Sequence, residues 1–485
     1  MIIIFIGKEF VMATNNEAKL QGNMGTGELV MSVLAFSGPL VCVSGFATVY
    51  YPMVGSGVPW LYIISGIILT FFTVGFSKMG TVMTRPGGFY AYITEGLGRN
   101  VGLSAAFLAT LGYTLIGLYG PPLFAIFMDN VMAIFNGPSI PWWIWGIGVV
   151  LCTWALAYRR IDLSAKVLFW VMLFECALIV LFDICSFATG HGAEAGGTMF
   201  HFPNLEIGGF GAALLLAFGN FFGFEATVIY REECKNPEKT IPRATFIAVI
   251  GIAVFYAIAS WALVAYYGAD GVVDAANAGS DTMFQIALGN MTFKVIQDVV
   301  TIVAATSTFA SILSLHNVAA RYFYNLGTDA ILPKKLGAVH KKHKSPYIAA
   351  SLVGIFWVIM LTIFAISGKD PNFLYPLFSG SGTFMVTMVL FLAGIAVFAY
   401  FAKDNHGFNL FITKIAPILG FLGIGALLIV SVMNFDTLTG ATGIISIIMM
   451  IAYIAYAFVA FFYAKHLKKT KPEVWEKIGR QNFTD

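Results

Sequence analysis

Long apolar runs follow one another along this chain, separated by short polar connections. Each run holds about 20 residues, the length at which an α-helix crosses the hydrocarbon core of a bilayer. The pattern predicts twelve transmembrane helices. They lie near residues 29–53, 57–82, 101–130, 141–158, 165–188, 207–231, 244–268, 295–324, 346–367, 373–401, 410–432 and 439–464.

The connections leave no room for a separate soluble domain. We therefore expect an all-α integral membrane protein with a single transmembrane domain over residues 29–465. A cytoplasmic tail over residues 1–28 would precede it, and another over 466–485 would follow. Composition agrees, because 58% of the 485 residues are hydrophobic and 11% are charged, whereas soluble domains carry about 25% charged residues.

Basic residues are distributed unequally between alternate connections. If the N-terminus is cytoplasmic, only Lys294 and Lys369 of the 28 Lys and Arg residues fall on external connections. Cytoplasmic loops of membrane proteins are enriched in Lys and Arg. We therefore expect a multi-pass protein in the lipid bilayer of the cell's inner (cytoplasmic) membrane, with both termini in the cytoplasm. The net charge of +3 gives no indication of nucleic acid as a partner.

Two predicted helices contain residues that interrupt helical structure. In the first, Pro39 removes a backbone donor and Gly38 weakens the helix beside it. The sixth holds three poor helix formers, Gly219, Asn220 and Gly223. We expect breaks near residues 37–44 and 219–224. Packing glycines and an ordinary proline kink are the alternative, but paired breaks at matching positions in two halves are typical of inverted-repeat transporters.

The breaks also predict where a substrate binds. Unwound backbone inside a membrane is tolerated where protein or a water-filled cavity satisfies its polar groups, and half-helix ends then offer N–H and C=O groups to a substrate. The predicted substrate-binding residues are Ser37, Gly38, Ser44, Tyr113, Phe218, Phe221, Phe222 and Glu225. Because aromatics make up 15% of the chain, ordinary packing is the alternative for each aromatic residue.

Glu175 lies near the middle of the fifth predicted helix, inside an otherwise apolar run. An ionisable side chain at that depth is costly and marks a functional site by default. Three roles are open. Burial disfavours the charged carboxylate, so Glu175 could take up and release a coupled proton. It could instead be the counter-ion of sodium or of a substrate ammonium group, or a neutral structural carboxyl.

Two further polar residues lie at membrane depth. Glu225 follows the break in the sixth helix, where it could face the substrate or hold the second half of that helix in place. His316 lies deep in the eighth predicted helix. A buried imidazole there could titrate near neutral pH, or it could be a hydrogen-bonded packing residue.

Three stretches of the sequence resemble the amino acid–polyamine–organocation (APC) permeases. The longest is residues 223–244, with the segment Glu-Glu-Cys-Lys-Asn-Pro-Glu-Lys-Thr-Ile-Pro-Arg after the sixth helix. The second is residues 319–334, where Ala330 stands in place of a family glycine, and the third is residues 83–92. The resemblance covers roughly residues 28–465. The usual first-helix Ile-Gly-x-Gly-Ile-Phe motif is absent, and Pro-Leu-Val-Cys-Val-Ser occupies its place.

The resemblance implies the LeuT-type fold with helices 1 and 6 broken. Two inverted five-helix repeats would span about residues 29–188 and 207–401, with two extra helices over about 410–465. In that fold the eighth helix faces an ion site on the fifth, so its hydroxyls are expected to hydrogen-bond Glu175. Several proton-coupled relatives carry a lysine near that position. The predicted proton- or ion-coupling residues are Glu175, Thr308, Ser311 and His316.

Other functions lack support in the sequence. It carries no HExxH set, GxSxG elbow or P-loop, so no enzyme is expected, and no filter sequence typical of a channel. A receptor would need a larger soluble domain. The five cysteines show no metal-ligand spacing, and no cofactor, metal or obligatory protein partner is indicated.

We therefore expect a secondary active transporter that moves amino acids or organic amines by alternating access. Coupling would be to H+ through Glu175, with an exchanger or a Na+-coupled symporter as the alternatives. Two buried acids without an evident buried cation favour a substrate with an ammonium group.

Overall fold

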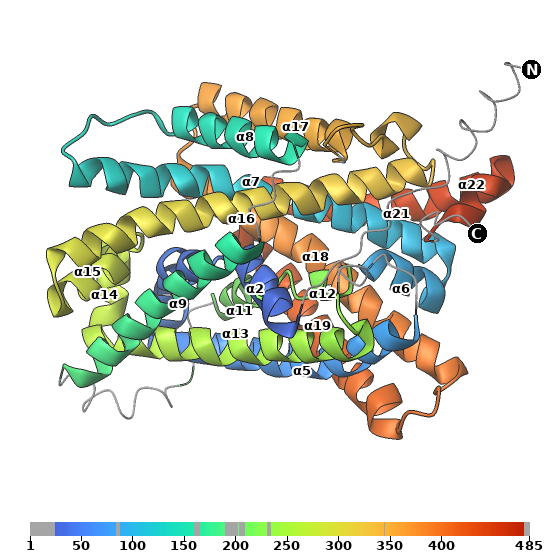
Figure 1. The fold of residues 1–485 in the computed structure, drawn as a ribbon, viewed down its shortest axis with the longest axis horizontal. Helices are drawn as coiled ribbons and strands as arrows, with labels where there is room; N and C mark the ends of the chain where they lie inside the picture. The colour runs from blue at the N-terminus through green and yellow to red at the C-terminus, as the bar shows by residue number, and fades with distance from the viewer. Residues whose placement is uncertain are drawn as a thin grey trace, which may run out of the picture.

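The computed structural model describes residues 25–83, 88–159, 165–189, 202, 209–229, 234–343 and 345–479. All regular secondary structure in these ranges is helical. Residues 1–24 and 480–485 of the two predicted tails lie outside them. Long helices run side by side along the longest axis of the molecule, with α6 and α22 near one end and α14 and α15 at the other (Figure 1).

The helices alternate between long segments and short connecting ones. Before residue 230 they are α2 (Thr26–Ser37), α3 (Pro39–Val41), the π-helix η1 (Cys42–Ala47), α4 (Thr48–Val54), η2 (Gly55–Gly57), α5 (Val58–Val82), α6 (Gly88–Leu97), α7 (Arg99–Ile134), α8 (Trp142–Arg159), α9 (Ala165–Ala188), α11 (Phe210–Gly219) and α12 (Ala226–Ile229). After residue 234 they are α13 (Pro237–Tyr267), α14 (Gly271–Gly279), α15 (Met283–Met291), α16 (Lys294–Thr328), η6 (Lys334–Gly337), α17 (Tyr347–Ile366), α18 (Pro371–Lys403), the π-helix η7 (Phe411–Ile415), α19 (Ala416–Met433), α20 (Phe435–Thr439), α21 (Gly443–Thr470) and α22 (Pro472–Lys477).

Nine helical stretches in the described part of the chain are long and apolar enough to cross a membrane. They are Pro39–Val82, Arg99–Ile134, Trp170–Ala188, Pro237–Tyr267, Lys294–Thr328, Tyr347–Ile366, Pro371–Lys403, Phe411–Met433 and Gly443–Thr470. The shorter apolar helices α2 and α11 lie in the predicted first and sixth spans, and α8 lies in the predicted fourth. The chain is therefore a multi-pass membrane protein, while the count of twelve spans stays a prediction.

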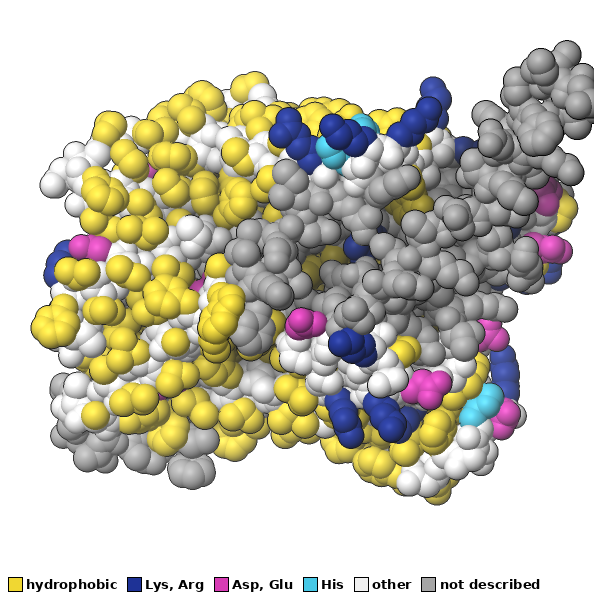
Figure 2. Space-filling model, viewed as in Figure 1, with side chains coloured by type: hydrophobic (Ala, Val, Ile, Leu, Met, Phe, Trp, Pro, Cys, Tyr) yellow, Lys and Arg dark blue, Asp and Glu magenta, His cyan; other side chains and the backbone are white. Residues whose placement is uncertain are grey.

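Apolar side chains form both the core and much of the outer surface. Most of α7 is buried, whereas α21 points many apolar side chains outward, including Ile444 at 72% exposure and Val459 at 65%. Hydrophobic side chains dominate the half of the visible face that shows few Lys and Arg side chains (Figure 2). An apolar surface of this extent suits contact with lipid.

Helices α7 and α18 approach each other closely in the interior. A Cβ added to Gly382 would lie 2.6 Å from the backbone nitrogen of Ile116 and 2.7 Å from the carbonyl oxygen of Gly112. Only glycine permits such an approach, and small residues are the usual means by which membrane helices pack closely. This packing fixes the inner faces of α7 and α18, which line the site described below.

The two predicted breaks are present. Helix α2 ends at Ser37, Gly38 takes the left-handed conformation with φ +62°, and α3 restarts at Pro39. Helix α11 ends at Gly219, residues 220–225 form turns, and α12 starts at Ala226. The first break is shorter than predicted, because residues 39–47 remain helical in α and π forms.

The two breaks also contact each other. Gly223 has φ +105°, and a Cβ added there would lie 2.7 Å from Phe36 Cβ and Cγ. Glycine is required at Gly223 both for the positive φ and for this approach. The two breaks therefore pack side by side at this point.

The C-terminal residues extend the fold beyond the predicted boundary at 465. Helix α21 continues to Thr470, and α22 follows it. Trp475 Nε1 donates to Asn100 Oδ1 at 2.9 Å, and the Arg99 guanidinium lies 4.5 Å from the centre of the Trp475 ring. Ile478 is fully buried in a small apolar cluster with Leu326 and other residues from α7, α16 and α21. The segment after α21 thus packs on the corner between α6 and α7.

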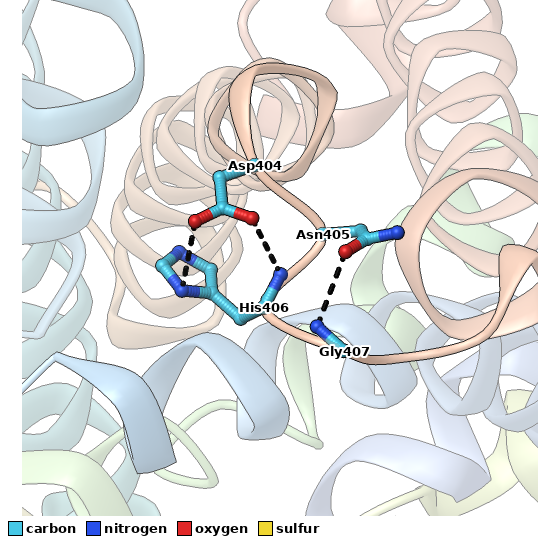
Figure 3. A network of polar contacts seen from close by, with 4 residues as sticks. All are labelled: Asp404, Asn405, His406 and Gly407. Carbon is cyan, nitrogen blue, oxygen red and sulfur yellow. Dashed lines mark hydrogen bonds and ion pairs between the residues drawn. The ribbon is translucent and has the colours of Figure 1, made fainter.

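A tight polar turn connects α18 to η7 (Figure 3). Asp404 Oδ1 accepts a hydrogen bond from His406 N–H at 2.9 Å, and Asn405 Oδ1 accepts one from Gly407 N–H at 3.1 Å. Such side-chain contacts with the backbone two residues on are how Asp and Asn stabilise turns. The turn reverses the chain, so that α19 packs against α18 and α5.

Lysine and arginine side chains gather on one half of the visible face (Figure 2). In the connection after α16 the exposed basic residues are Lys334, Lys335, Lys341 and Lys342. The opposite end of α16 begins at Lys294, which pairs with Asp298 at 2.9 Å. The basic residues of this predicted cytoplasmic connection thus follow one end of α16, and Lys294, which was predicted to be external, lies at its other end.

Candidate functional site

A small internal cavity lies beside the two breaks. Its volume is about 30 Å³, which is room for about two water molecules, since one needs roughly 10–15 Å³ on this measure. Residues of the broken segments and of α7, α16 and α18 surround it. They are Phe36, Ser37, Cys42, Phe46, Ile116, Tyr119, Leu216, Gly219, Asn220, Phe222, Leu315, Ser379 and Thr383. The cavity therefore has room for water but not for a molecule of the size of an amino acid.

The cavity lining is divided into polar and apolar parts. The polar part contains Ser37 and Asn220 at the two breaks and Ser379 and Thr383 one turn apart on α18. Aromatic and aliphatic side chains supply the rest. None of the described residues in the lining carries a formal charge.

Hydrogen bonds hold the polar residues of both breaks. Ser37 Oγ and Tyr256 Oη lie 2.5 Å apart, and the Cys42 thiol donates to the Ser37 carbonyl at 3.1 Å. Asn220 Nδ2 donates to Tyr62 Oη at 3.0 Å. The break residues are therefore anchored to α5 and α13, which pack against each other.

Glu175 is fully buried on α9 and links two other elements. Its Oε2 accepts a hydrogen bond from Ser307 Oγ on α16 at 2.7 Å and a longer one from Leu40 N–H at 3.4 Å. Its Oε1 has no hydrogen-bond partner among the described residues. Leu40 directly follows the first break, so the carboxyl joins the broken helix to α16.

Glu225 lies at the start of α12 and faces the backbone of its own break. Its Oε2 accepts from Gly223 N–H at 2.9 Å, and its Oε1 accepts a hydrogen bond from Tyr113 Oη on α7. Tyr113 in turn stacks on Tyr322 of α16, with ring centres 5.5 Å apart. Neither Glu225 nor Tyr113 belongs to the cavity lining. Both lie where the second break meets α7.

On the opposite side of the cavity an aromatic row extends toward the start of α18. The ring of Phe46 lies 5.2 Å from that of Tyr119 and 6.2 Å from that of Tyr375. Farther along α7, Asn130 Nδ2 donates to Asp281 Oδ2 at 2.8 Å, which ties α7 to the connection between α14 and α15. Aromatic contacts thus border the cavity at Phe46 and Tyr119, while the Tyr113–Glu225 contact lies outside the lining.

The structure brings only some of the predicted substrate residues to the cavity. Ser37 and Phe222 line it. Ser44 instead donates to its own helix at Leu40 O, 2.7 Å away. The predicted residues that are absent from the lining are Gly38, Ser44, Tyr113, Phe218, Phe221 and Glu225.

The predicted coupling residues separate in the same way. Ser307 provides the hydroxyl that bonds Glu175, whereas Thr308 donates to Ala304 O and Ser311 donates to Phe36 O at 3.1 Å. Adjacent helical residues point about 100° apart, so Ser307 and Thr308 face different neighbours. His316 bonds Ala350 O at 2.9 Å and contacts the ring of Trp357, both on α17.

Sequence reasoning missed several residues of the site. Ser379 and Thr383 have the spacing of one helical turn on the tenth predicted span, a usable signal for a polar face. The other missed residues are Cys42, Tyr256 and Ser307, for which the sequence offers no comparable pattern. Asn220 was predicted to interrupt the helix, but its side chain was not predicted to line the site. Within the described residues no group of three or more His, Cys, Asp or Glu could hold a metal ion.

The amino acid permease family model matches residues 27–478, and the chain belongs to this family. The branched-chain amino acid permease BcaP of Lactococcus lactis subsp. cremoris (strain MG1363) is 23% identical over 388 residues, covering 76% of this chain and 81% of the relative. The relatives of this chain are amino acid and polyamine permeases of the APC superfamily.

Two other relatives differ in what their names say they carry. The low-affinity putrescine importer PlaP of Escherichia coli (strain K12) is 23% identical over 356 residues, which is 71% of this chain and 75% of the relative. The lysine-specific permease LysP of the same Lactococcus lactis strain is 24% identical over 360 residues, covering 69% and 67%. Family membership therefore leaves the choice between neutral and cationic substrates open.

Proposed function

We propose that this protein is a secondary active transporter that moves an amino acid or organic amine by alternating access, with proton coupling through Glu175. The observation that carries the proposal is the buried contact of Glu175 with both Leu40 N–H and Ser307 Oγ. A carboxyl shared between a broken helix and its neighbour responds to any movement between them. Conversely, gain or loss of its proton changes the strength of both hydrogen bonds.

The fold that suits this mechanism is the LeuT-type arrangement. It would comprise twelve spans, two inverted repeats over about 29–188 and 207–401, and two extra helices, in the inner membrane with both termini cytoplasmic. Support comes from the family match, the paired breaks at Gly38 and 220–225, and the basic connection after α16. Broken helices near the midplane are the usual substrate and ion sites of such transporters.

Purified full-length protein in liposomes would test the function. Uptake of a radiolabelled panel of amino acids and amines would be measured with an imposed pH gradient, with a sodium gradient, and with the same unlabelled solute inside. The proposal predicts accumulation with the pH gradient alone. Accumulation that needs sodium would favour a sodium symporter, and uptake only against internal solute would favour an exchanger. No uptake of any panel member would overturn the proposal.

A further inference from the structure

The placement of the two buried carboxyls carries information about substrate charge. Glu175 is hydrogen-bonded to Ser307 and to Leu40 N–H, and Glu225 to Tyr113 and Gly223 N–H. Neither carboxyl belongs to the cavity lining. The two acids that could meet a substrate ammonium group therefore lie outside the lining, and each gives at least one oxygen to hydrogen-bond donors of the protein.

The described lining offers neutral groups in their place. Its polar side chains are hydroxyls, one thiol and one amide, contributed by Ser37, Cys42, Tyr119, Asn220, Ser379 and Thr383. Taking an unpaired ion out of water into such a site costs several kcal/mol. A diamine would bring two uncompensated positive charges, and a basic amino acid would bring one beyond its zwitterion.

A neutral amino acid avoids this cost in large part. Its ammonium and carboxylate groups have no net charge together, and each can take hydrogen bonds from neutral donors and acceptors. Asn220 supplies an amide acceptor in its Oδ1, because its Nδ2 already donates to Tyr62 and Tyr50. Ser379 and Thr383 supply hydroxyls that can donate or accept. The polar part of the cavity therefore suits the charged end of a zwitterion.

The apolar part limits the size of the side chain. The rings of Phe46 and Tyr119 are in edge-to-face contact, with centres 5.2 Å apart. A Cβ added to Gly219 would lie 2.8 Å from Thr383 Oγ1, so α11 and α18 are already close at this point. The remaining apolar wall is formed by Phe36, Ile116, Leu216, Phe222 and Leu315. A short aliphatic side chain would require the least separation of these walls.

We propose that the substrate is a zwitterionic amino acid with a small apolar side chain, of the size range from alanine to valine, rather than a diamine or a basic amino acid. The inference rests on the proposed transport function, since it assigns the substrate class of that same cavity. It follows from the uncharged lining together with the position of both acids outside that lining.

Competition in liposomes containing the full-length protein would test the inference. Radiolabelled alanine would be the reporter, with unlabelled valine, lysine and putrescine as competitors. Valine should inhibit at concentrations near those of alanine itself, while lysine and putrescine should need about 100-fold more, a difference of two decades in affinity. Preferred uptake of putrescine or lysine would overturn the inference and leave the transport function standing. If none of the four is transported or bound while another amino acid or amine of the panel is, the inference fails and the transport function stands, whereas failure of the whole panel overturns the transport function.

A pair of variants tests the cause of the selectivity. Thr383→Asp adds an acid to the lining, and Thr383→Asn adds a side chain of the same shape without the charge. Inhibition by lysine or putrescine should improve about tenfold or more in Thr383→Asp relative to Thr383→Asn, because a charge-assisted hydrogen bond becomes available. Equal inhibition in two folded variants would show that the charge of the lining does not set selectivity. If either variant fails to fold, the wild-type competition still decides the inference.

Discussion

Ser307 Oγ donates a hydrogen bond of 2.7 Å to Glu175 Oε2, which joins α16 to α9 in the interior of the membrane domain. The same oxygen also accepts from Leu40 N–H, just after the break in the first helix. Three elements that are far apart in sequence therefore meet at one carboxyl. Any movement of the broken helix relative to α16 must change at least one of these two hydrogen bonds.

The first prediction concerns coupling at this carboxyl. Glu175→Gln preserves an oxygen that accepts from Ser307 and Leu40 but cannot gain and lose a proton. Exchange of internal for external substrate should remain, while accumulation driven by a pH gradient should fall to about the level of passive equilibration. The measurement is uptake in liposomes with and without the gradient. Full accumulation by Glu175→Gln would assign the residue to a structural role.

Two neighbouring hydroxyls provide a matched pair for the second prediction. Ser307→Ala removes the hydrogen bond to Glu175, whereas Thr308→Val removes one that returns to Ala304 O of the same helix. A hydrogen bond to a charged group contributes about 1.5–3 kcal/mol, so Ser307→Ala should change the pH dependence of gradient-driven uptake markedly. Thr308→Val should leave that pH dependence unchanged. Identical pH profiles for both variants would contradict the assignment of Ser307.

A third prediction distinguishes a structural from a substrate-binding role for Glu225. Because its carboxyl bonds Gly223 N–H and Tyr113 Oη, Glu225→Gln should lower the melting temperature of the detergent-solubilised protein. Substrate affinity should stay within about twofold, a change of less than 0.5 kcal/mol. Tyr113→Phe removes the same contact from the other partner, so the two losses of stability should be non-additive in the double variant. A tenfold or greater loss of affinity in Glu225→Gln alone would instead indicate direct substrate contact.

Cys42 offers a direct readout of cavity occupancy, because it lines the cavity and is 1% exposed. In a variant with the other cysteines (Cys152, Cys176, Cys185 and Cys234) replaced by alanine, a membrane-permeant maleimide should react with Cys42 only when the site opens. Substrate at ten times its dissociation constant should slow labelling about tenfold by mass action. Cys42→Ser in the same background is the control for background labelling. Labelling that substrate leaves unaffected would place Cys42 away from the binding site.

The last prediction concerns pH and stability at the end of α16. Burial raises the pKa of Asp329 from 3.8 to about 6, against the opposing effects of the Tyr90 hydroxyl, Gly479 N–H and Lys477. A raised pKa means that the folded state holds the proton more tightly than the unfolded state. The resulting stability is present below about pH 4 and is lost as the pH rises through about 6.

Asp329→Asn removes this titration while it keeps an acceptor for the Tyr90 hydroxyl, which bonds Asp329 Oδ2 at 2.9 Å. The melting temperature of the wild type relative to Asp329→Asn should therefore decrease between pH 4 and pH 6.5. The shift of about two pKa units corresponds to roughly 3 kcal/mol at most. A constant difference between the two proteins over this range would show that burial of Asp329 does not control its ionisation.

The sequence by itself determined the features that depend on local composition and on hydrophobic run length. The apolar runs predicted a multi-pass helical membrane protein, and Gly38-Pro39 and residues 219–223 predicted both breaks. Glu175 stood out because a carboxyl inside an apolar run is costly wherever the run is buried. These inferences need only the chemistry of each residue and its immediate neighbours along the chain.

Only the tertiary structure decided which side chains meet. Ser307 and Thr308 are equivalent in sequence terms, yet the rotation of α16 about its axis turns only Ser307 toward Glu175. The same rotation directs His316 to α17, and the packing of α7 against the second break turns Tyr113 to Glu225. Helix rotation and depth follow from close packing against distant segments. That packing is not encoded in any local pattern. It leaves the cavity lined by neutral groups, and it places outside the lining two acids for which the sequence had left coupling, substrate and structural roles open.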